Sequence, residues 1–204
     1  MNSGEKARMT FKENIDKNEL SEYPLSGFQG DIVLVDSYKK LKQSIKVLKS
    51  GDMLGFDTET KPSFRKGKVN RVALMQLSNG RQAFIFRINI IGLPDELIDI
   101  LSDKSIIKAG VAIHEDIKGL KSISDFQEQG FIELQDYVKD FGIMSSGLRK
   151  LAAIILGFRI SKRQQVSNWE ASELTEAQLM YAATDAWVCY EIYKKLDKRS
   201  LGIK

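Results

Sequence analysis

The sequence predicts an α/β protein built on one mixed β-sheet with helices on both faces. The first half of the chain contains two apolar segments, residues 71–78 and 82–88, which are separated by a turn containing Asn79 and Gly80. This dipeptide is a strong signal for a hairpin, so the two segments are expected to pair as antiparallel strands. The second half alternates short apolar segments with amphipathic ones, which is typical of parallel strands connected by helices. Together the two patterns predict a mixed sheet.

The other elements of the first half follow from local signals. Residues 31–37 are predicted to form a strand, and Asp36 or Ser37 is placed to cap the helix that follows it. That helix is expected over residues 38–50. The next strand is expected to end at Glu59, where a polar and basic loop separates it from the hairpin.

The second half is predicted to contain four helices and two strands. The helices cover residues 94–103, 114–123, 147–157 and 175–196, and the strands or extended segments cover 105–113 and 131–138. The last helix opens with Thr175 and Gln178 in the spacing of a capping box, in which each residue satisfies a backbone N–H of the other.

At 204 residues, the chain is long enough for one well-formed core and short for two domains. Residues 1–27 are rich in Lys and Glu, so we expect a polar arm that lies outside the core, followed by a folded domain over residues 28–204. A net charge of +4 is a mild sign of a polyanionic partner. The polar N-terminal segment lacks a secretory signal, and no membrane span is expected, so the predicted location is intracellular, cytoplasmic by default.

Two carboxylates stand at the end of a hydrophobic strand. Met53, Leu54 and Phe56 are typical of a buried strand, and Asp57 and Glu59 follow two positions apart. Because successive side chains of a strand alternate between its faces, both acids leave the same face, with α-carbons about 7 Å apart. Two negative charges this close repel each other, so a positive charge is expected nearby.

Two further acids occupy apolar faces of predicted helices. Asp185 falls in the apolar arc of the last helix, opposite Thr184, and Asp116 lies toward the apolar side of the first turn of an earlier helix. Taken singly, each acid also fits an ordinary hydrogen-bonded carboxylate, and this alternative stays open. If all four acids converge, bound cations explain them together, and oxygen ligands select magnesium or manganese (Mg²⁺ or Mn²⁺). Two such ions about 4 Å apart are a known arrangement for phosphodiester cleavage.

Tyr181 precedes Asp185 by four positions, so its phenol is expected on the same face of the helix. A phenol with a pKa near 10 is suited to orient a water molecule by hydrogen bonding and is a poor base. A tyrosine of the hydrophobic core is the alternative interpretation. Cys189, the single cysteine, is expected to be a small buried hydrophobe without redox chemistry.

Three motifs carry a resemblance to a known family. They are "FDTET" around Asp57 and Glu59, "GVAIHEDIKGL" around Asp116, and "YAATDAWVCYEIY" around Tyr181 and Asp185. In order and spacing they resemble the exonuclease motifs of the DnaQ-like DEDD superfamily, in the tyrosine-bearing branch that includes ribonuclease D. The segments "GKVNRVALMQLS" and "VSNWEASELTEAQLMYAATDA" are most similar to the exonuclease domain of the Werner syndrome protein. The resemblance covers residues 28–197.

The resemblance implies a ribonuclease H-like fold and 3′→5′ removal of nucleotides by two-metal-ion hydrolysis. It implies that Asp57, Glu59 and Asp185 hold the ion that activates water. Asp57 also bridges to the second ion, which Asp116 supports. Tyr181 positions the nucleophile. All five residues are of the type that the family motifs require.

Two basic segments are candidates for contacts with nucleic acid. The loop after the first acids places an aromatic residue among basic ones, which suits a single strand because bases stack while phosphates are neutralised. The second segment precedes the last helix. The candidates are Phe64, Arg65, Lys66, Lys68, Lys162 and Arg163, with Lys61 and Arg71 beside them, and Thr58 through its backbone by the resemblance. A solvated charged loop is the alternative for either segment.

The predicted function is that of a Mg²⁺- or Mn²⁺-dependent 3′→5′ exonuclease acting on single-stranded or 3′-recessed nucleic acid. One alternative is a catalytically inactive nucleic-acid-binding module of the same fold. Another is a structural domain whose acids are buried hydrogen-bonding groups. DNA and RNA both remain candidate substrates, because discrimination by the 2′-OH depends on contacts away from the acids.

Overall fold

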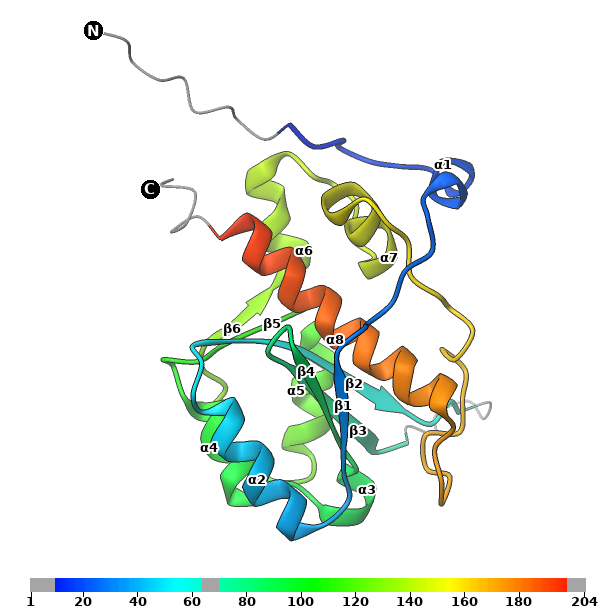
Figure 1. The fold of residues 1–204 in the computed structure, drawn as a ribbon. Helices are drawn as coiled ribbons and strands as arrows, with labels where there is room; N and C mark the ends of the chain where they lie inside the picture. Colours follow the sequence, from blue (N-terminus) through cyan, green and yellow to red (C-terminus); the bar gives the residue numbers. More distant parts are fainter. Residues whose placement is uncertain (1–9, 64–69, 198–204) are drawn as a thin grey trace, which may run out of the picture.

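The computed structural model describes residues 10–63 and 70–197 and shows a mixed sheet of six strands (Figure 1). The strands are β1 (Asp31–Val35), β2 (Met53–Thr60), β3 (Val72–Ser78), β4 (Gln82–Phe86), β5 (Ile107–Gly110) and β6 (Phe131–Glu133), in the order β1-β4-β3-β2-β5-β6. Strands β2, β3 and β4 form the antiparallel meander, and β1, β5 and β6 join parallel to their neighbours. The predicted mixed sheet is confirmed.

The turn between β3 and β4 has the chemistry that the sequence predicts. The side-chain oxygen of Asn79 accepts hydrogen bonds from the backbone N–H groups of Arg81 and Gln82, at 3.1 and 2.9 Å. Gly80 has φ +87, a backbone conformation that glycine adopts without the steric cost of a side chain. The hairpin is therefore closed by local interactions alone.

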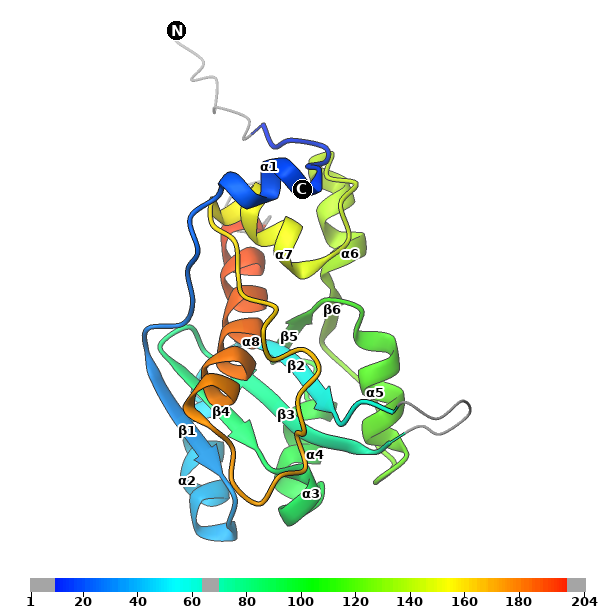
Figure 2. The same cartoon turned by 90° about the vertical axis from the view of Figure 1, so that its right-hand side faces the viewer.

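Helices cover both faces of the sheet, as predicted (Figure 2). They are α1 (Lys17–Glu22), α2 (Tyr38–Leu48), α3 (Ile88–Ile91), α4 (Asp95–Ser102), α5 (Ile113–Lys121), α6 (Leu134–Tyr137), α7 (Leu148–Leu151) and α8 (Glu176–Leu196), with a 3₁₀-helix at Val138–Phe141 and a π-helix at Ala152–Leu156. Helices α2, α4 and α5 pack on one face of the sheet, against Leu54 and Phe56 of β2. Helix α8 crosses the other face, and its predicted capping box at Thr175 is present.

One predicted strand is wrong in part. Residues 131–138 were expected to be extended, but β6 ends at Glu133 and the chain turns at once into α6. The Glu133 carboxylate accepts a hydrogen bond from the backbone N–H of Gln135 at 2.9 Å and so caps this helix. The side chain of the last strand residue therefore starts the following helix.

The expectation that the N-terminal segment lies outside the core is wrong for its described part. Ile15 and Leu20 are 2% and 6% exposed and form a small hydrophobic cluster with Ala153. Hydrophobic residues spaced through a charged segment were enough to anchor it. The boundary between arm and domain at residue 28 stays a prediction.

The chain that leads from α1 to β1 crosses over α8 and is bonded both to α8 and to the segment that precedes it. The Ser26 backbone N–H donates to the Arg159 carbonyl at 2.9 Å, and the Phe28 backbone N–H donates to the Thr184 hydroxyl at 3.1 Å. Thr184 is 5% exposed as a result, although the helical projection placed it on the polar arc. Within the described residues, no helix is both long and apolar enough to span a membrane.

Candidate active site

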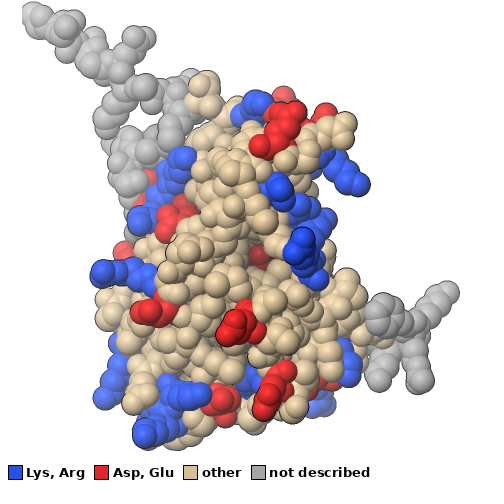
Figure 3. All heavy atoms as spheres, turned by 45° about the vertical axis from the view of Figure 1, so that its right-hand side comes forward, with Lys and Arg blue, Asp and Glu red and all other residues tan. Residues whose placement is uncertain are grey.

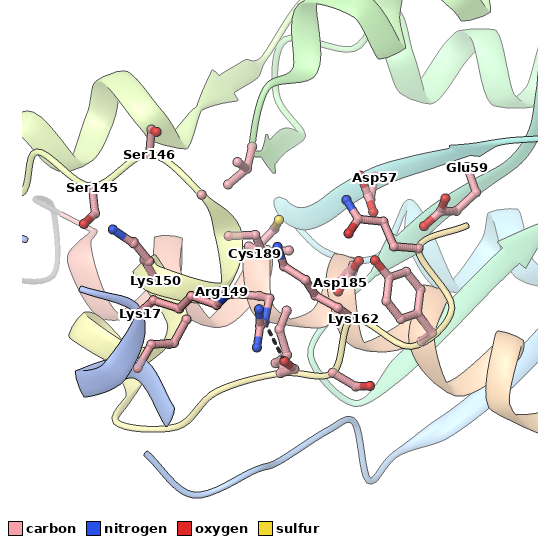
Figure 4. A pocket seen from close by; sticks show the side chains of 18 of the residues that line it. Lys17, Asp57, Glu59, Ser145, Ser146, Arg149, Lys150, Lys162, Asp185 and Cys189 are labelled. Carbon is pink, nitrogen blue, oxygen red and sulfur yellow. Dashed lines mark hydrogen bonds between the residues drawn. The ribbon is translucent and has the colours of Figure 1, made fainter. Parts of the chain in front are cut away.

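Three predicted carboxylates meet where β2 passes under α8. Oxygen atoms of Asp57, Glu59 and Asp185 lie within 4.8 Å of one another (Figure 4). Asp57 and Glu59 leave the same face of β2, as strand geometry predicts, and Asp185 projects toward them from α8. Asp185 is 7% exposed, whereas the other two are half-buried.

A close contact between strand and helix creates this meeting point. A side chain built on Gly55 would lie 1.9 Å from the Ala186 carbonyl oxygen and 2.6 Å from the Tyr190 nitrogen, far below any normal contact. Glycine therefore lets the backbones of β2 and α8 approach until Asp57 and Asp185, each within two residues of this contact, face each other.

Asp116 joins the group from the first turn of α5. Its carboxylate accepts a hydrogen bond from the Thr58 hydroxyl, which ties α5 to the middle of the acidic strand segment. Asp116 is not one of the three acids whose oxygens lie within 4.8 Å of one another, but its charge helps to raise the pKa of Asp57 and of Glu59. We call Asp57, Glu59, Asp116 and Asp185 the acidic centre.

Glu133, which the sequence analysis did not single out, fixes the start of α5. Its two carboxylate oxygens accept hydrogen bonds from the backbone N–H groups of Ala112 and Ile113, at 3.0 and 2.8 Å. Ala112 is left-handed, with φ 60, a conformation that costs energy for a residue with a side chain. A bidentate carboxylate at this turn compensates that cost and holds α5 with Asp116 in place.

All four acids have raised pKa values. Burial is the main cause for each, because the charged form loses contact with water. Repulsion from neighbouring carboxylates adds to the rise for Asp57, Glu59 and Asp116, whereas the hydrogen bond from Tyr181 partly offsets it for Asp185. The pKa of Asp57 lies well above its usual value, and the others rise to about 9 for Glu59, about 6 for Asp116 and about 7 for Asp185. Ion pairs among the described residues involve none of them.

The acidic centre therefore has the donor chemistry of a divalent-cation site. It offers several carboxylate oxygens, which suit Mg²⁺ or Mn²⁺, and none of residues 10–63 and 70–197 forms an ion pair with these acids that would let them ionise together. The structure fits the predicted class of cofactor.

Tyr181 lies next to this centre, as its spacing in the helix predicts. Its hydroxyl donates a hydrogen bond to Asp185, and its ring packs 5.9 Å from the ring of the buried Trp169. Burial, together with the nearby carboxylates, raises the pKa of Tyr181 far above neutrality. The phenol therefore stays protonated and acts as a hydrogen-bond donor rather than as a base.

Gln76 is a second neighbour that the sequence analysis missed. It pairs with Asp57 across the β2–β3 ladder, is 0% exposed, and its amide nitrogen and oxygen have no hydrogen-bond partner among the described residues. A polar residue within the otherwise apolar segment "VALMQLS" was the available signal. An unpartnered buried amide beside a carboxylate is a candidate to position that carboxylate.

A cavity of about 740 Å³ opens from the acidic centre toward α1 and α7 (Figure 4). Besides Asp57, Glu59 and Asp185, its charged lining residues are Lys17, Arg149, Lys150 and Lys162, which we call the basic wall. In the space-filling view, acidic atoms lie at the bottom of a hollow whose rim carries basic side chains (Figure 3). Negative and positive charges are thus separated along one cavity.

The predicted nucleic-acid contacts have different outcomes. Phe64, Arg65, Lys66 and Lys68 lie outside the described residues. Lys162 lines the cavity of the acidic centre, whereas Arg163 lines a neighbouring cavity of about 480 Å³ that also reaches Tyr181 and Asp185. Lys61 is engaged in an ion pair with Glu170 at 3.3 Å. Thr58 lines the main cavity, but its hydroxyl is used by Asp116 and its backbone N–H by Asp57.

The fold and the site place the chain in a class of α/β domains that carry an acidic centre between an interior strand of a mixed sheet and the helix crossing it, in a cavity with a basic wall. Comparison with known proteins gives the particular family. The family model described as 3′-5′ exonuclease matches residues 32–200, and the chain belongs to this 3′-5′ exonuclease family.

Individual relatives agree with this assignment. The chain is 36% identical to the mouse protein named bifunctional 3′-5′ exonuclease/ATP-dependent helicase WRN over 185 residues, which are 85% of this chain and 13% of that protein. The solved Nibbler EXO domain of Aedes aegypti superposes with a TM-score of 0.75 at 26% identity, covering 87% of this chain and 93% of that domain. Escherichia coli RNase D, at 24% identity, shares the fold with a TM-score of 0.76 over 84% of this chain and 46% of its own.

These findings confirm the predicted resemblance to the tyrosine-bearing branch of the DEDD superfamily and its ribonuclease H-like fold. The chain spans less than two thirds of the length of the first curated relatives that it matches.

Proposed function

We propose that this chain is a 3′→5′ exonuclease that hydrolyses the terminal phosphodiester bond of a nucleic acid with two bound Mg²⁺ or Mn²⁺ ions. The observation that carries the proposal is the convergence of Asp57, Glu59 and Asp185 in a chain of the 3′-5′ exonuclease family. Carboxylates at this spacing, with raised pKa values and no basic partner among the described residues, need cations to ionise together.

In this proposal, Asp57, Glu59 and Asp185 hold one ion, Asp57 is shared with the second, and Asp116 supports the second. Divalent ions at such a site supply Lewis-acid stabilisation of the phosphate charge and lower the pKa of the attacking water. Tyr181, a protonated donor bonded to Asp185, orients that water toward the phosphorus.

The proposed substrate is a single-stranded or 3′-recessed end of DNA or RNA. The charge pattern of the cavity supports this substrate, because basic side chains suit a phosphate backbone. Contacts to phosphates do not distinguish ribose from deoxyribose. The predicted contacts from the loop around Phe64 and from the Thr58 backbone are part of this proposal. A cytoplasmic location also stays a prediction from the sequence.

The test is a cleavage assay on 5′-labelled oligonucleotides, both single-stranded and with a recessed 3′ end, in Mg²⁺, Mn²⁺ or chelator. We expect shortening from the 3′ end that requires metal and falls at least about 10³-fold in Asp57→Ala, because several kcal/mol of transition-state stabilisation are lost. Asp31→Ala, an exposed acid on β1, is the matched control and should keep full activity.

Folding is checked in the same experiment. In chelator, Asp57→Ala should melt at the same temperature as the wild type or higher, because one repelling charge is removed. Binding of the oligonucleotide without metal-dependent shortening would instead identify an inactive binding module. A large loss of metal-free stability in Asp57→Ala would support a purely structural role for the acids.

A further inference from the structure

The basic wall is built by two segments far apart in the sequence. Lys17 belongs to α1, whereas Arg149 and Lys150 belong to α7 and Lys162 to the segment that follows (Figure 4). Of these, only Lys162 was expected to contact nucleic acid. The N-terminal segment therefore supplies one side of the cavity that leads to the acidic centre.

This side of the cavity is held in place by specific contacts. The Met144 backbone N–H donates to the Glu13 carbonyl at 2.8 Å, and the Ser145 hydroxyl donates to the Asn14 side-chain oxygen at 2.5 Å. Lys150 reaches the same Asn14 oxygen at 3.3 Å. With Ile15 2% exposed beside them, the N-terminal segment is fixed against the loop before α7.

The four cations of the basic wall are available to a ligand. Lys17 and Lys162 are exposed, and within the described part of the chain none of the four takes part in an ion pair. The carboxylates that line the cavity are those of the acidic centre, at its other end. Lys150 bonds to Asn14 and its charge lowers the pKa of Asp16, and Arg149 donates to the Ile160 carbonyl, so both side chains are also held in place. Four cations facing one cavity still repel each other, and a chain of phosphates is the ligand that relieves this repulsion.

On the basis of the proposed function, we propose that the basic wall binds the backbone phosphates of the substrate strand upstream of the bond being cleaved. The N-terminal segment is then a working part of the exonuclease, and Lys17 with Lys150 makes the wall's outermost phosphate contacts. The 3′-terminal phosphodiester lies at the acidic centre, and the rest of the strand runs toward α1 and α7.

Substrate length separates this role from catalysis. A dinucleotide without a terminal phosphate has one phosphodiester, the one to be cleaved, so it has no upstream phosphate for the basic wall. A strand of about 12 nucleotides has many, and it extends past the cavity. Removing basic-wall cations should therefore weaken binding and cleavage of the long substrate and leave cleavage of the short one unchanged.

The experiment compares wild type, Lys17→Ala/Lys150→Ala and Lys17→Ala on oligothymidylate and oligouridylate of both lengths. The matched control is Lys39→Ala/Lys46→Ala, which removes the same charge from exposed positions on α2, away from α1 and α7 (Figure 1). Cleavage gives kcat/KM at each length, and fluorescence anisotropy in chelator gives Kd for the long strand.

For the long strand, we expect Kd and KM to rise about tenfold in the double variant and less in Lys17→Ala. The slope of log Kd against log salt should become shallower by about 1.4, since each contact to a single-stranded phosphate contributes about 0.7. Dinucleotide cleavage and melting temperature should stay at the wild-type values, and the α2 control should change nothing.

An equal loss at both lengths, no loss at all, or the same loss in the α2 control would overturn the inference. Lys17→Ala keeps the test valid if the Lys150 change disturbs folding, because the Lys17 side chain is exposed and forms no ion pair with any residue that the structure describes. The two proposals fail differently. If no substrate is cleaved but the long strand still binds more weakly to the double variant than to the wild type, only the proposed nuclease activity is overturned. If cleavage occurs and is the same in the wild type and the basic-wall variants, only this inference is overturned.

Discussion

The acidic centre and the basic wall lie in one cavity but differ in almost every physical property. The acids sit at the end of β2 and on helices packed against the sheet, with burial and mutual repulsion raising their pKa values. The basic side chains sit on short outer helices and a connecting segment, largely exposed. The acidic centre thus gathers ionisable groups at a buried place, whereas the basic wall distributes its charges over a more solvent-exposed surface.

This difference indicates which side chains must be held at fixed positions. Chemistry at the phosphate requires the acids to be held within a small distance of one another, so they are carried by elements packed on both sides. Phosphate binding by flexible cations tolerates movement, because the attraction falls off slowly with distance. Substitutions that alter packing should thus damage the acidic centre, and substitutions that alter charge should damage the basic wall.

Among changes outside the acidic centre itself, the largest effect is expected for Gly55→Ala, which tests whether the close packing of β2 on α8 creates the acidic centre. The added carbon has no room, so the helix must move away from the strand. We expect a stability loss of about 3 kcal/mol or more and a fall in cleavage of about 100-fold. Chemical denaturation measures the loss of stability, and single-turnover kinetics measures the fall in cleavage.

Gly51→Ala is the matched control, because a side chain there would meet nothing within 4 Å. Its stability should stay within about 0.5 kcal/mol of the wild type. Equal behaviour of the two variants would show that the strand–helix contact does not determine the site.

Tyr181→Phe should have the next largest effect. Only the hydroxyl bonded to Asp185 is lost, so metal affinity should persist while the single-turnover rate falls about 10-fold to 100-fold. Calorimetric titration with Mn²⁺ provides the affinity. An unchanged rate would remove the phenol from the mechanism.

The acidic centre should also make metal-free stability depend on pH. The pKa of Glu59 is about 9 in the folded protein and 4.5 ordinarily, so its stabilising contribution is complete below pH 4.5 and is lost as the pH rises toward 9. In chelator, wild type should melt several degrees lower than Glu59→Gln near pH 9 and at a similar temperature near pH 4.5.

Saturating Mg²⁺ should reduce this difference, because the cation stabilises the ionised carboxylate and competes with its proton. Metal affinity should accordingly increase with pH over the same range. A wild-type melting temperature in chelator that matches Glu59→Gln at every pH would contradict the raised pKa.

The smallest effect is expected for Gln76→Met. The change removes a buried amide that has no hydrogen-bond partner in the described part of the chain, and it keeps the side-chain length, so metal-free stability should be unchanged or rise by about 1 kcal/mol. If the amide positions Asp57 in the loaded site, Mn²⁺ affinity should fall severalfold at the same time. A loss of stability without a change in affinity would mean that Gln76 serves only the fold.

Much of the acidic centre could be predicted from the sequence. The hydrophobic pattern is interrupted by an acid at three places, which are Asp57 with Glu59, Asp116, and Asp185. Such an interruption can be recognised within a short stretch of sequence. The hairpin at Asn79 was visible for the same reason, because its turn is closed by neighbouring residues.

The basic wall could not be predicted in this way. Lys17 and Lys150 are charged residues in charged or mixed surroundings, and nothing local distinguishes them from any solvated lysine. They face one cavity because Asn14 bonds to the loop before α7 and Ile15 packs near Ala153 after it, and these contacts join residues more than a hundred positions apart. A similarly large separation in the sequence explains why Thr184 was assigned to the exposed face of its helix. It is buried by the segment around Phe28, whose backbone N–H donates to the Thr184 hydroxyl.

By itself the sequence determined the mixed sheet, the identity of the four acids and the family motifs, because periodicity, turn chemistry and motif spacing are local properties. Three features are visible only in the folded molecule: how closely β2 approaches α8 at Gly55, that the N-terminal segment is anchored, and that cations from two segments far apart in the sequence face one cavity. These features arise from packing between distant segments, and a contact of that kind leaves no periodic trace in either segment alone.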